Sequence, residues 1–129
     1  MENPEPILSI VSILAILLSP VIAVLVGQYL SEKRRRQERR EVLLRDLIEN
    51  RYKVSSEGFL RAFNSIPIVF REQKRIRTLH KEYYDSVTRQ DPESIQKGKM
   101  VAVILAICRE LGYSKDIEES DIDNVFVPK

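Results

Sequence analysis

Reactive and metal-ligating side chains are scarce in this sequence. Its 129 residues include one cysteine, Cys108, one histidine, His80, and no tryptophan. A single cysteine excludes an intramolecular disulfide, and one cysteine with one histidine does not indicate a metal cluster or a Cys/His catalytic pair. We therefore predict a protein that is not an enzyme and that needs no cofactor or metal, although a pair of carboxylates in a pocket would still permit catalysis.

Charged side chains are also absent from residues 6–31. Fourteen of the twenty residues 7–26 are Ile, Leu or Val. At roughly 1.5 Å per residue, a helix of this length crosses the ~30 Å hydrocarbon core of a bilayer. Pro20 would kink such a helix without expelling it from the membrane. The sequence thus predicts one transmembrane helix over residues 7–30.

Cations follow the apolar run directly, whereas the residues before it carry Glu2 and Glu5 and no Lys or Arg. This asymmetry predicts an N-out, C-in orientation in the inner (cytoplasmic) membrane. It also argues against a cleaved signal peptide, because such a signal would need a positive amino-terminal flank. An anionic inner leaflet attracts such cations by about 1 kcal/mol each. Nucleic acid is the less favoured partner because no aromatic residue interleaves the cations. The expected membrane-surface residues are Lys33, Arg34, Arg35, Arg36, Arg39 and Arg40.

Small side chains recur every four residues within the apolar run, at Ala15, Ser19, Ala23 and Gly27. This spacing places them on one ridge of a helix, where two backbones can approach closely. Close packing of this kind drives helix association in lipid. The stripe predicts a homo-oligomer, with chance spacing of common membrane residues as the alternative.

The expected fold is all-α, with the single amino-terminal transmembrane helix continuing into a small cytosolic helical bundle. Four segments follow from this pattern: a short extracytoplasmic tail, the transmembrane helix, a basic and then amphipathic juxtamembrane helix, and a small cytosolic helical domain. Their predicted bounds are residues 1–6, 7–30, 31–52 and 53–129.

The cytosolic part contains several helix signals. Leu43, Leu44, Leu47 and Ile48 form an apolar face, and Ser55 or Ser56 can cap a following short helix with Phe59, Leu60, Phe63 and Ile66. Pro67 predicts the end or a kink of that helix. A helix over residues 71–90 is expected next, with a buried side formed by Ile76, Leu79, Tyr83 and Val87 and with His80 on its polar face.

Asp91 and Pro92 form a helix start signal, in which an oxygen cap precedes a proline at the first helical position. The helix that follows has the broadest apolar stripe, so we predict that it is central to the domain. Gly112 has the position of a terminating glycine. One more helical turn is expected in the acidic tail, before three apolar residues that could dock. The central stripe comprises Met100, Val101, Ile104, Ile107, Cys108 and Leu111, and the three apolar residues are Val125, Phe126 and Val127.

Two stretches of the sequence show a family resemblance. The first is EVLLRDLIENRYKVSSEGFLRAFNSIPIVF, in which Arg51, Ala62, Asn64, Ile66 and Phe70 form the frame R-x10-A-x-N-x-I-x3-F. The second is RELGYSKDIEESDIDNVFVP. Together with the apolar amino-terminal helix and the arginine-rich stretch, they resemble DUF6680, a bacterial and prophage family of unknown function. The resemblance implies an architecture but no activity. Family members tend to carry Trp in the helix after Phe70, and here Leu79 or Tyr83 is expected to fill that volume.

Two polar residues of the frame are candidate binding residues for a ligand or protein partner. Asn64 can satisfy helix-end carbonyls or donate to a ligand, and Arg51 can bind phosphate or carboxylate. The alternative is structural: a helix-end cap for Asn64, and an ion pair of Arg51 with Glu49, Glu57 or the acidic tail.

Two functions are compatible with the sequence. The first is a non-enzymatic, single-pass membrane-anchored interaction module that self-associates and presents its cytosolic domain to a protein partner. The alternative is a membrane effector of the antiphage type, whose cytosolic domain senses a small anionic ligand such as a signalling nucleotide. Arg51 and the basic surface motivate this alternative.

Overall fold

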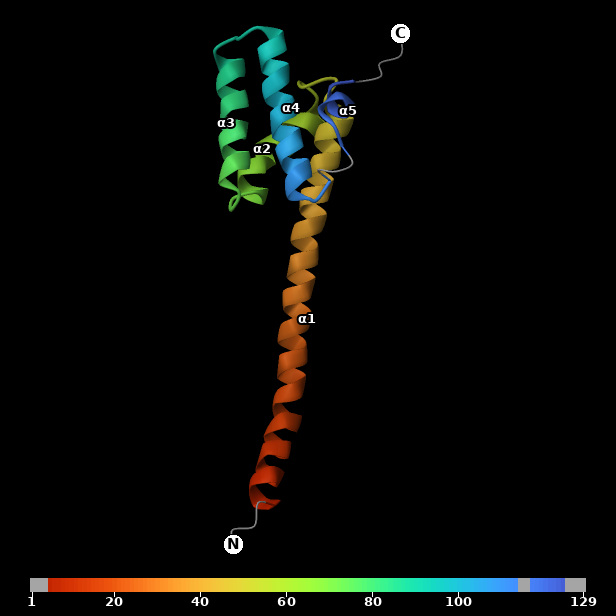
Figure 1. Cartoon of the computed structure of the whole chain (residues 1–129), viewed down its shortest axis with the longest axis vertical. Coiled ribbons are helices and arrows are strands. Elements are labelled where there is room, and N and C mark those ends of the chain that lie inside the picture. Colours follow the sequence, from red (N-terminus) through yellow and green to blue (C-terminus); the bar gives the residue numbers. More distant parts are fainter. Residues whose placement is uncertain (1–4, 114–116, 125–129) are drawn as a thin grey trace. The chain divides into compact units, whose positions relative to one another are not determined.

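The computed structural model of the chain describes residues 5–113 and 117–124. All regular structure in these residues is helical, as the sequence predicts (Figure 1). Most of the predicted extracytoplasmic tail, and the apolar residues Val125, Phe126 and Val127, lie outside the described residues. The helices are α1 (Glu5–Asn50), α2 (Glu57–Val69), α3 (Lys74–Thr88), α4 (Glu93–Glu110) and α5 (Glu119–Asp123).

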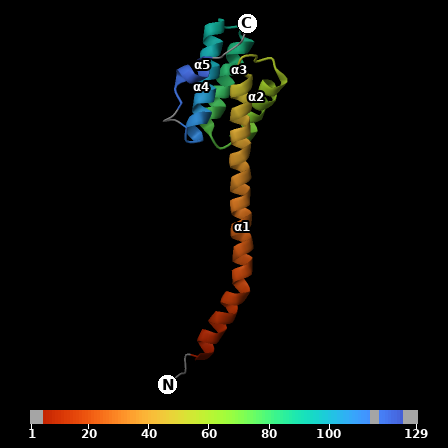
Figure 2. The same ribbon diagram turned by 90° about the vertical axis from the view of Figure 1, so that its right-hand side faces the viewer.

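The chain divides into two compact units, residues 1–37 and residues 38–129. The first unit contains the apolar part of α1, in which an 18-residue window has a mean hydropathy of 2.8 and no buried residue. By length and composition, α1 can therefore cross a membrane. The helix continues through Pro20, and Figure 2 shows it bending within its apolar part.

The second unit is a small helical domain that includes the last part of α1. The sequence predicts a domain that begins at residue 53, whereas this unit begins at residue 38. The difference arises because Leu43, Leu44 and Leu47 are buried in the domain core. Leu47 in particular is only 1% exposed.

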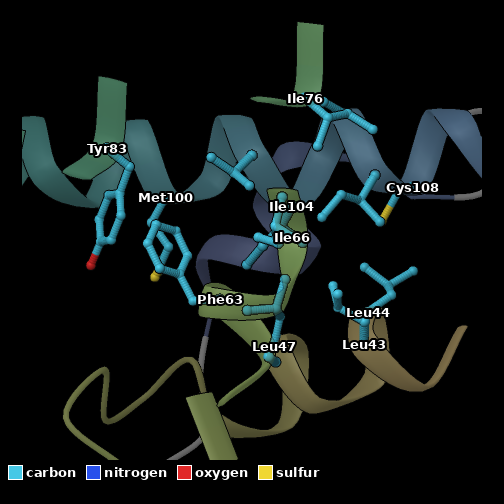
Figure 3. Close-up of a cluster of buried hydrophobic side chains, with 14 of the residues drawn as sticks. Leu43, Leu44, Leu47, Phe63, Ile66, Ile76, Tyr83, Met100, Ile104 and Cys108 are labelled. Carbon is cyan, nitrogen blue, oxygen red and sulfur yellow. The ribbon is translucent and has the colours of Figure 1, made fainter. Parts of the chain in front are cut away.

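Helix α4 supplies the largest share of this core, as its broad apolar stripe predicts. Figure 3 shows Met100, Ile104 and Cys108 of α4 among buried side chains of α1, α2 and α3. Burying a large apolar side chain contributes about 1.5–3 kcal/mol, so this cluster holds the domain together. Its buried members on α4 are Met100, Val101, Val103, Ile104, Ala106, Ile107 and Cys108.

Both ends of α4 can be compared with the prediction. Gly112 has a φ of +88°, and the backbone N–H of Tyr113 donates to the carbonyl of Cys108, which confirms the terminating glycine. The predicted start is wrong in detail. Pro92 itself is the N-cap residue and no side chain caps the helix. The carboxylate of Asp91 instead accepts a 3.0 Å hydrogen bond from Arg89.

Helix α2 begins as predicted, because the Ser56 hydroxyl accepts a hydrogen bond from the backbone N–H of Phe59. It does not end at Pro67 but continues to Val69. Proline lacks an N–H, so the carbonyl of Phe63 loses its normal helical partner. His80 of α3 replaces that partner, with Nε2 at 3.1 Å from the Phe63 oxygen.

Helix α3 starts at Lys74, three residues after the predicted start, and two side chains differ from prediction. Val87 is exposed, and Ser86 is buried in its place. His80 is half-buried rather than on a polar face. Leu79 and Tyr83, which are expected to fill the volume of the missing tryptophan, both lie against the core.

Candidate functional site

Arg51 follows α1 directly and donates hydrogen bonds to four backbone carbonyls. Its Nε donates to Ile122 at 2.8 Å, and its Nη2 donates to Asn124 at 3.1 Å. Nη2 also lies 3.4 Å from the carbonyl of Asp121, and Nη1 donates to the carbonyl of Ile48 at the end of α1. The guanidinium thus joins the carboxyl end of α1 to α5.

Two further contacts hold α5 in place. The Ile122 side chain is buried, with 3% of its surface exposed. The Asp123 carboxylate forms an ion pair with Lys97 of α4, with Oδ1 and Nζ 3.1 Å apart. The sequence suggests the acidic tail as one partner of Arg51, and the tail is indeed the segment that Arg51 contacts. The acceptors, however, are backbone carbonyls rather than carboxylates.

A cavity of about 560 Å³ lies beside Arg51. This volume is within the range of small-molecule sites. Burial raises the pKa of the Tyr83 hydroxyl, so this lining group stays neutral at physiological pH. The cations of the lining, Arg51 and Lys97, already contact the protein itself. The lining residues are Arg51, Tyr52, Val54, Tyr83, Glu93, Gln96, Lys97, Met100, Asp123 and Asn124.

A second hollow of about 310 Å³ lies along the last part of α1. Its lining is mainly apolar and consists of Glu41, Leu44, Arg45, Ile48, Glu49, Tyr113 and Ile117. This hollow offers fewer polar groups to a ligand than the larger cavity does.

The cations that the sequence predicts at a membrane surface differ in their surroundings. Lys33, Arg34, Arg35 and Arg39 are exposed. Arg36 forms an exposed ion pair with Glu32 at 2.9 Å. Arg40 belongs to the domain, because its guanidinium lies 5.4 Å from the centre of the Phe70 ring, a cation–π contact.

The small-residue stripe of α1 lies on exposed helix surface. The Ser19 hydroxyl donates to the carbonyl of Ala15, so it is satisfied within the helix. A Cβ added at Gly27 would meet no heavy atom within 4 Å. The space beside Ala15, Ser19, Ala23 and Gly27 is therefore open to a neighbouring helix.

A cluster of aromatic rings around His80 was not predicted from the sequence. The His80 ring stacks on the Phe63 ring with centroids 4.2 Å apart, and the Tyr83 ring meets Phe63 edge-on at 5.0 Å. Burial lowers the pKa of His80 below its ordinary value near 6.5, and the hydrogen bond to the Phe63 carbonyl opposes this shift. Because a carbonyl only accepts, Nε2 is the protonated ring nitrogen. Pro67 four residues after Phe63 is the sequence signal that could have revealed the need for such a donor.

Comparison with known proteins gives one match. The model of DUF6680, a family of unknown function, matches residues 2–129. The chain belongs to the DUF6680 family. No curated protein and no solved structure matches it. The resemblance seen in the sequence is thereby confirmed over nearly the whole chain, while a bacterial or prophage origin stays a prediction.

In this DUF6680 chain, the residues of the frame divide into two groups. Ala62, Ile66 and Phe70 are buried in the domain core, so their role is packing. Asn64 is exposed on α2, between the buried Phe63 and Ile66. Arg51 and Asn64 therefore have different surroundings. Their binding roles stay predictions.

Proposed function

We propose that this DUF6680 protein is a non-enzymatic, single-pass membrane protein with its amino terminus outside and its helical domain in the cytoplasm. It self-associates through α1 and presents the domain to a protein partner. The observation that carries this proposal is the contrast within α1. Residues 7–30 expose every large apolar side chain, whereas the second unit buries many of its apolar residues in one core.

Exposed apolar surface of this extent supports a lipid environment. Soluble proteins rarely expose continuous apolar patches of more than a few hundred Å². Ile, Leu and Val each favour insertion by about 0.3–0.6 kcal/mol near the centre of a membrane helix. The cations after Leu30 favour the cytoplasmic side and an anionic inner leaflet.

The proposed topology can be tested with reporter fusions. A cytoplasm-active reporter after Lys129 is expected to be active, and a cysteine at position 5 is expected to react with an impermeant reagent from outside. Moving the cations Lys33 to Arg40 to the other flank is expected to weaken or invert this preference. Labelling of position 5 only after the cells are opened would contradict the proposed orientation.

Self-association can be tested on the full chain in detergent. Gly27→Leu and Ala23→Leu are expected to weaken oligomers, because bulky side chains hold two backbones apart. Ile16→Leu and Val24→Leu, on other faces of α1, are the matched controls and are expected to change little. Equal loss at stripe and control positions would contradict an interface on the stripe, and a monomer in every condition would remove self-association from the proposal.

The alternative function, sensing of an anionic ligand, receives less support. The guanidinium of Arg51 is engaged by carbonyls, and Lys97 is paired with Asp123. A phosphate would have to displace one of these contacts. Thermal unfolding of the full chain with a panel of nucleotides tests this alternative, because a ligand raises the stability of the state that it binds.

A further inference from the structure

The turn between α2 and α3 combines an exposed apolar side chain with several exposed cations. Ile68, near the end of α2, is 76% exposed, the highest value among the large hydrophobic side chains of the described residues. Arg71, Lys74 and Arg75 follow within seven residues, and all are exposed. Residues 68–75 thus combine one exposed apolar side chain with three cations and one carboxylate, Glu72.

The three cations of this turn form no ion pair with any described residue. Some other surface cations of the domain are paired, such as Arg61 with Glu57 and Lys99 with Glu82. Within the described part of the chain, no ion pair includes Arg71, Lys74 or Arg75. Their charge is therefore available to an anionic surface outside the protein.

Contacts inside the domain place this turn at the end where α1 enters. Arg40 lies over the ring of Phe70, which caps α2. Gln73, at the start of α3, donates to Glu110 at the end of α4 at 3.2 Å. Figure 1 shows the α2–α3 turn and the end of α4 at one end of the domain, and the α3–α4 turn at the other.

Only ten residues of chain separate Arg40, at this end of the domain, from Leu30, the last residue of the predicted membrane span. The headgroup layer occupies roughly 5–8 Å on each side of the hydrocarbon core. Such a short tether gives the turn a high effective concentration at the lipid surface.

We infer that residues 68–75 form a second, peripheral contact with anionic lipid, in which Arg71, Lys74 and Arg75 bind headgroup phosphates and Ile68 enters the interface between headgroups and acyl chains. This inference rests on the proposed function, since it requires α1 to be in the membrane. Charge attraction and apolar burial add in such interfacial sites. The contact would fix one face of the domain toward the bilayer and leave the opposite end to a protein partner.

Environment-sensitive fluorophores on single cysteines of the full chain test the inference. The chain is reconstituted in vesicles of phosphatidylcholine, with or without phosphatidylglycerol. Ile68→Cys carries the test label, Tyr84→Cys a control label on α3, and Ile16→Cys a label in the span. Cys108 is 1% exposed, so the native thiol is protected from the reagent in the folded chain.

The label at position 68 is expected to shift its emission to shorter wavelength in vesicles with phosphatidylglycerol, while the label at position 84 remains in water. The triple change Arg71→Gln, Lys74→Gln and Arg75→Gln is expected to abolish the shift. Removal of equal charge elsewhere, by Arg61→Gln, Lys81→Gln and Arg89→Gln, is expected to preserve it.

Two failures are distinguishable. If the label at position 16 lies in lipid and the label at position 68 stays in water in both vesicles, the second contact is overturned while the anchor stands. If the label at position 16 is itself in water, the proposed function fails. An equal response of position 68 to both lipid compositions would overturn the assigned role of the cations.

Discussion

Helix α1 contains two apolar regions that differ in one respect. Leu17, in the first, is 64% exposed, whereas Leu47, in the second, is 1% exposed. Both lie in the same continuous helix and have the same side chain, so helix propensity does not distinguish them. The difference is the partner: α2, α3 and α4 share one core with the second region, whereas no described residue covers the first. A helix that is apolar all round, with no protein to cover it, favours a lipid environment.

The largest expected effect comes from placing the same charge in both regions. Leu47→Asp buries an unpaired carboxylate and is expected to destabilise the domain by about 3–5 kcal/mol or more, a large part of the stability of so small a unit. Leu17→Asp is expected to leave domain unfolding unchanged and to make membrane insertion less favourable by about 3–4 kcal/mol. Hydrogen exchange of α4 measures the first effect, and a membrane-insertion assay measures the second. Destabilisation of the domain by Leu17→Asp would contradict the conclusion that the first apolar region makes no contribution to the domain core.

A smaller effect on domain stability is expected when two arginines of the second unit, Arg51 and Arg61, are compared. Arg51→Met removes the hydrogen bonds to α5 and is expected to cost about 1–3 kcal/mol, with faster hydrogen exchange in residues 119–123. Arg61→Met removes an exposed ion pair with Glu57 and is expected to cost less than about 0.5 kcal/mol. If the two variants exchange equally slowly in α5, Arg51 is not required to hold that helix, and burial of Ile122 with the Lys97–Asp123 ion pair is sufficient.

The smallest expected effect concerns pH and the second unit alone. His80 has a folded-state pKa below its unfolded value near 6.5, so the unfolded chain binds more protons in that window. Domain stability is expected to be full above pH 6.5 and to fall as pH decreases through that value toward the folded-state pKa. Denaturant unfolding at several pH values measures this slope, and His80→Gln is expected to reduce it. A domain that becomes more stable on acidification through this window would contradict the sign.

Local signals in the sequence were sufficient for the helices and several of their ends. Ser56 and Gly112 were identified correctly, since capping depends on residues within one turn. Pro67 was expected to end or kink α2, and α2 ends at Val69, two residues after it. His80, thirteen residues after Pro67, satisfies the carbonyl that proline leaves unpaired, and no local rule predicts that contact. Val87 was expected on the buried side of α3 but is exposed, and its neighbour Ser86 is buried, because the packing of α3 against the other helices decides which of two adjacent positions faces the core.

The sequence alone determined the all-helical class and the apolar helix with its flanking cations, because these depend on composition and periodicity along the chain. It also resembled the DUF6680 family in short residue frames, and the family match over residues 2–129 confirms that resemblance. Only the tertiary structure decided where the domain begins, what Arg51 contacts and which cations form ion pairs. Those properties depend on which segments meet: Arg51 and Ile122 are separated by 71 residues, and no local pattern connects them. Contacts over such separations are set by how the helices pack, and one-dimensional periodicity does not specify that packing.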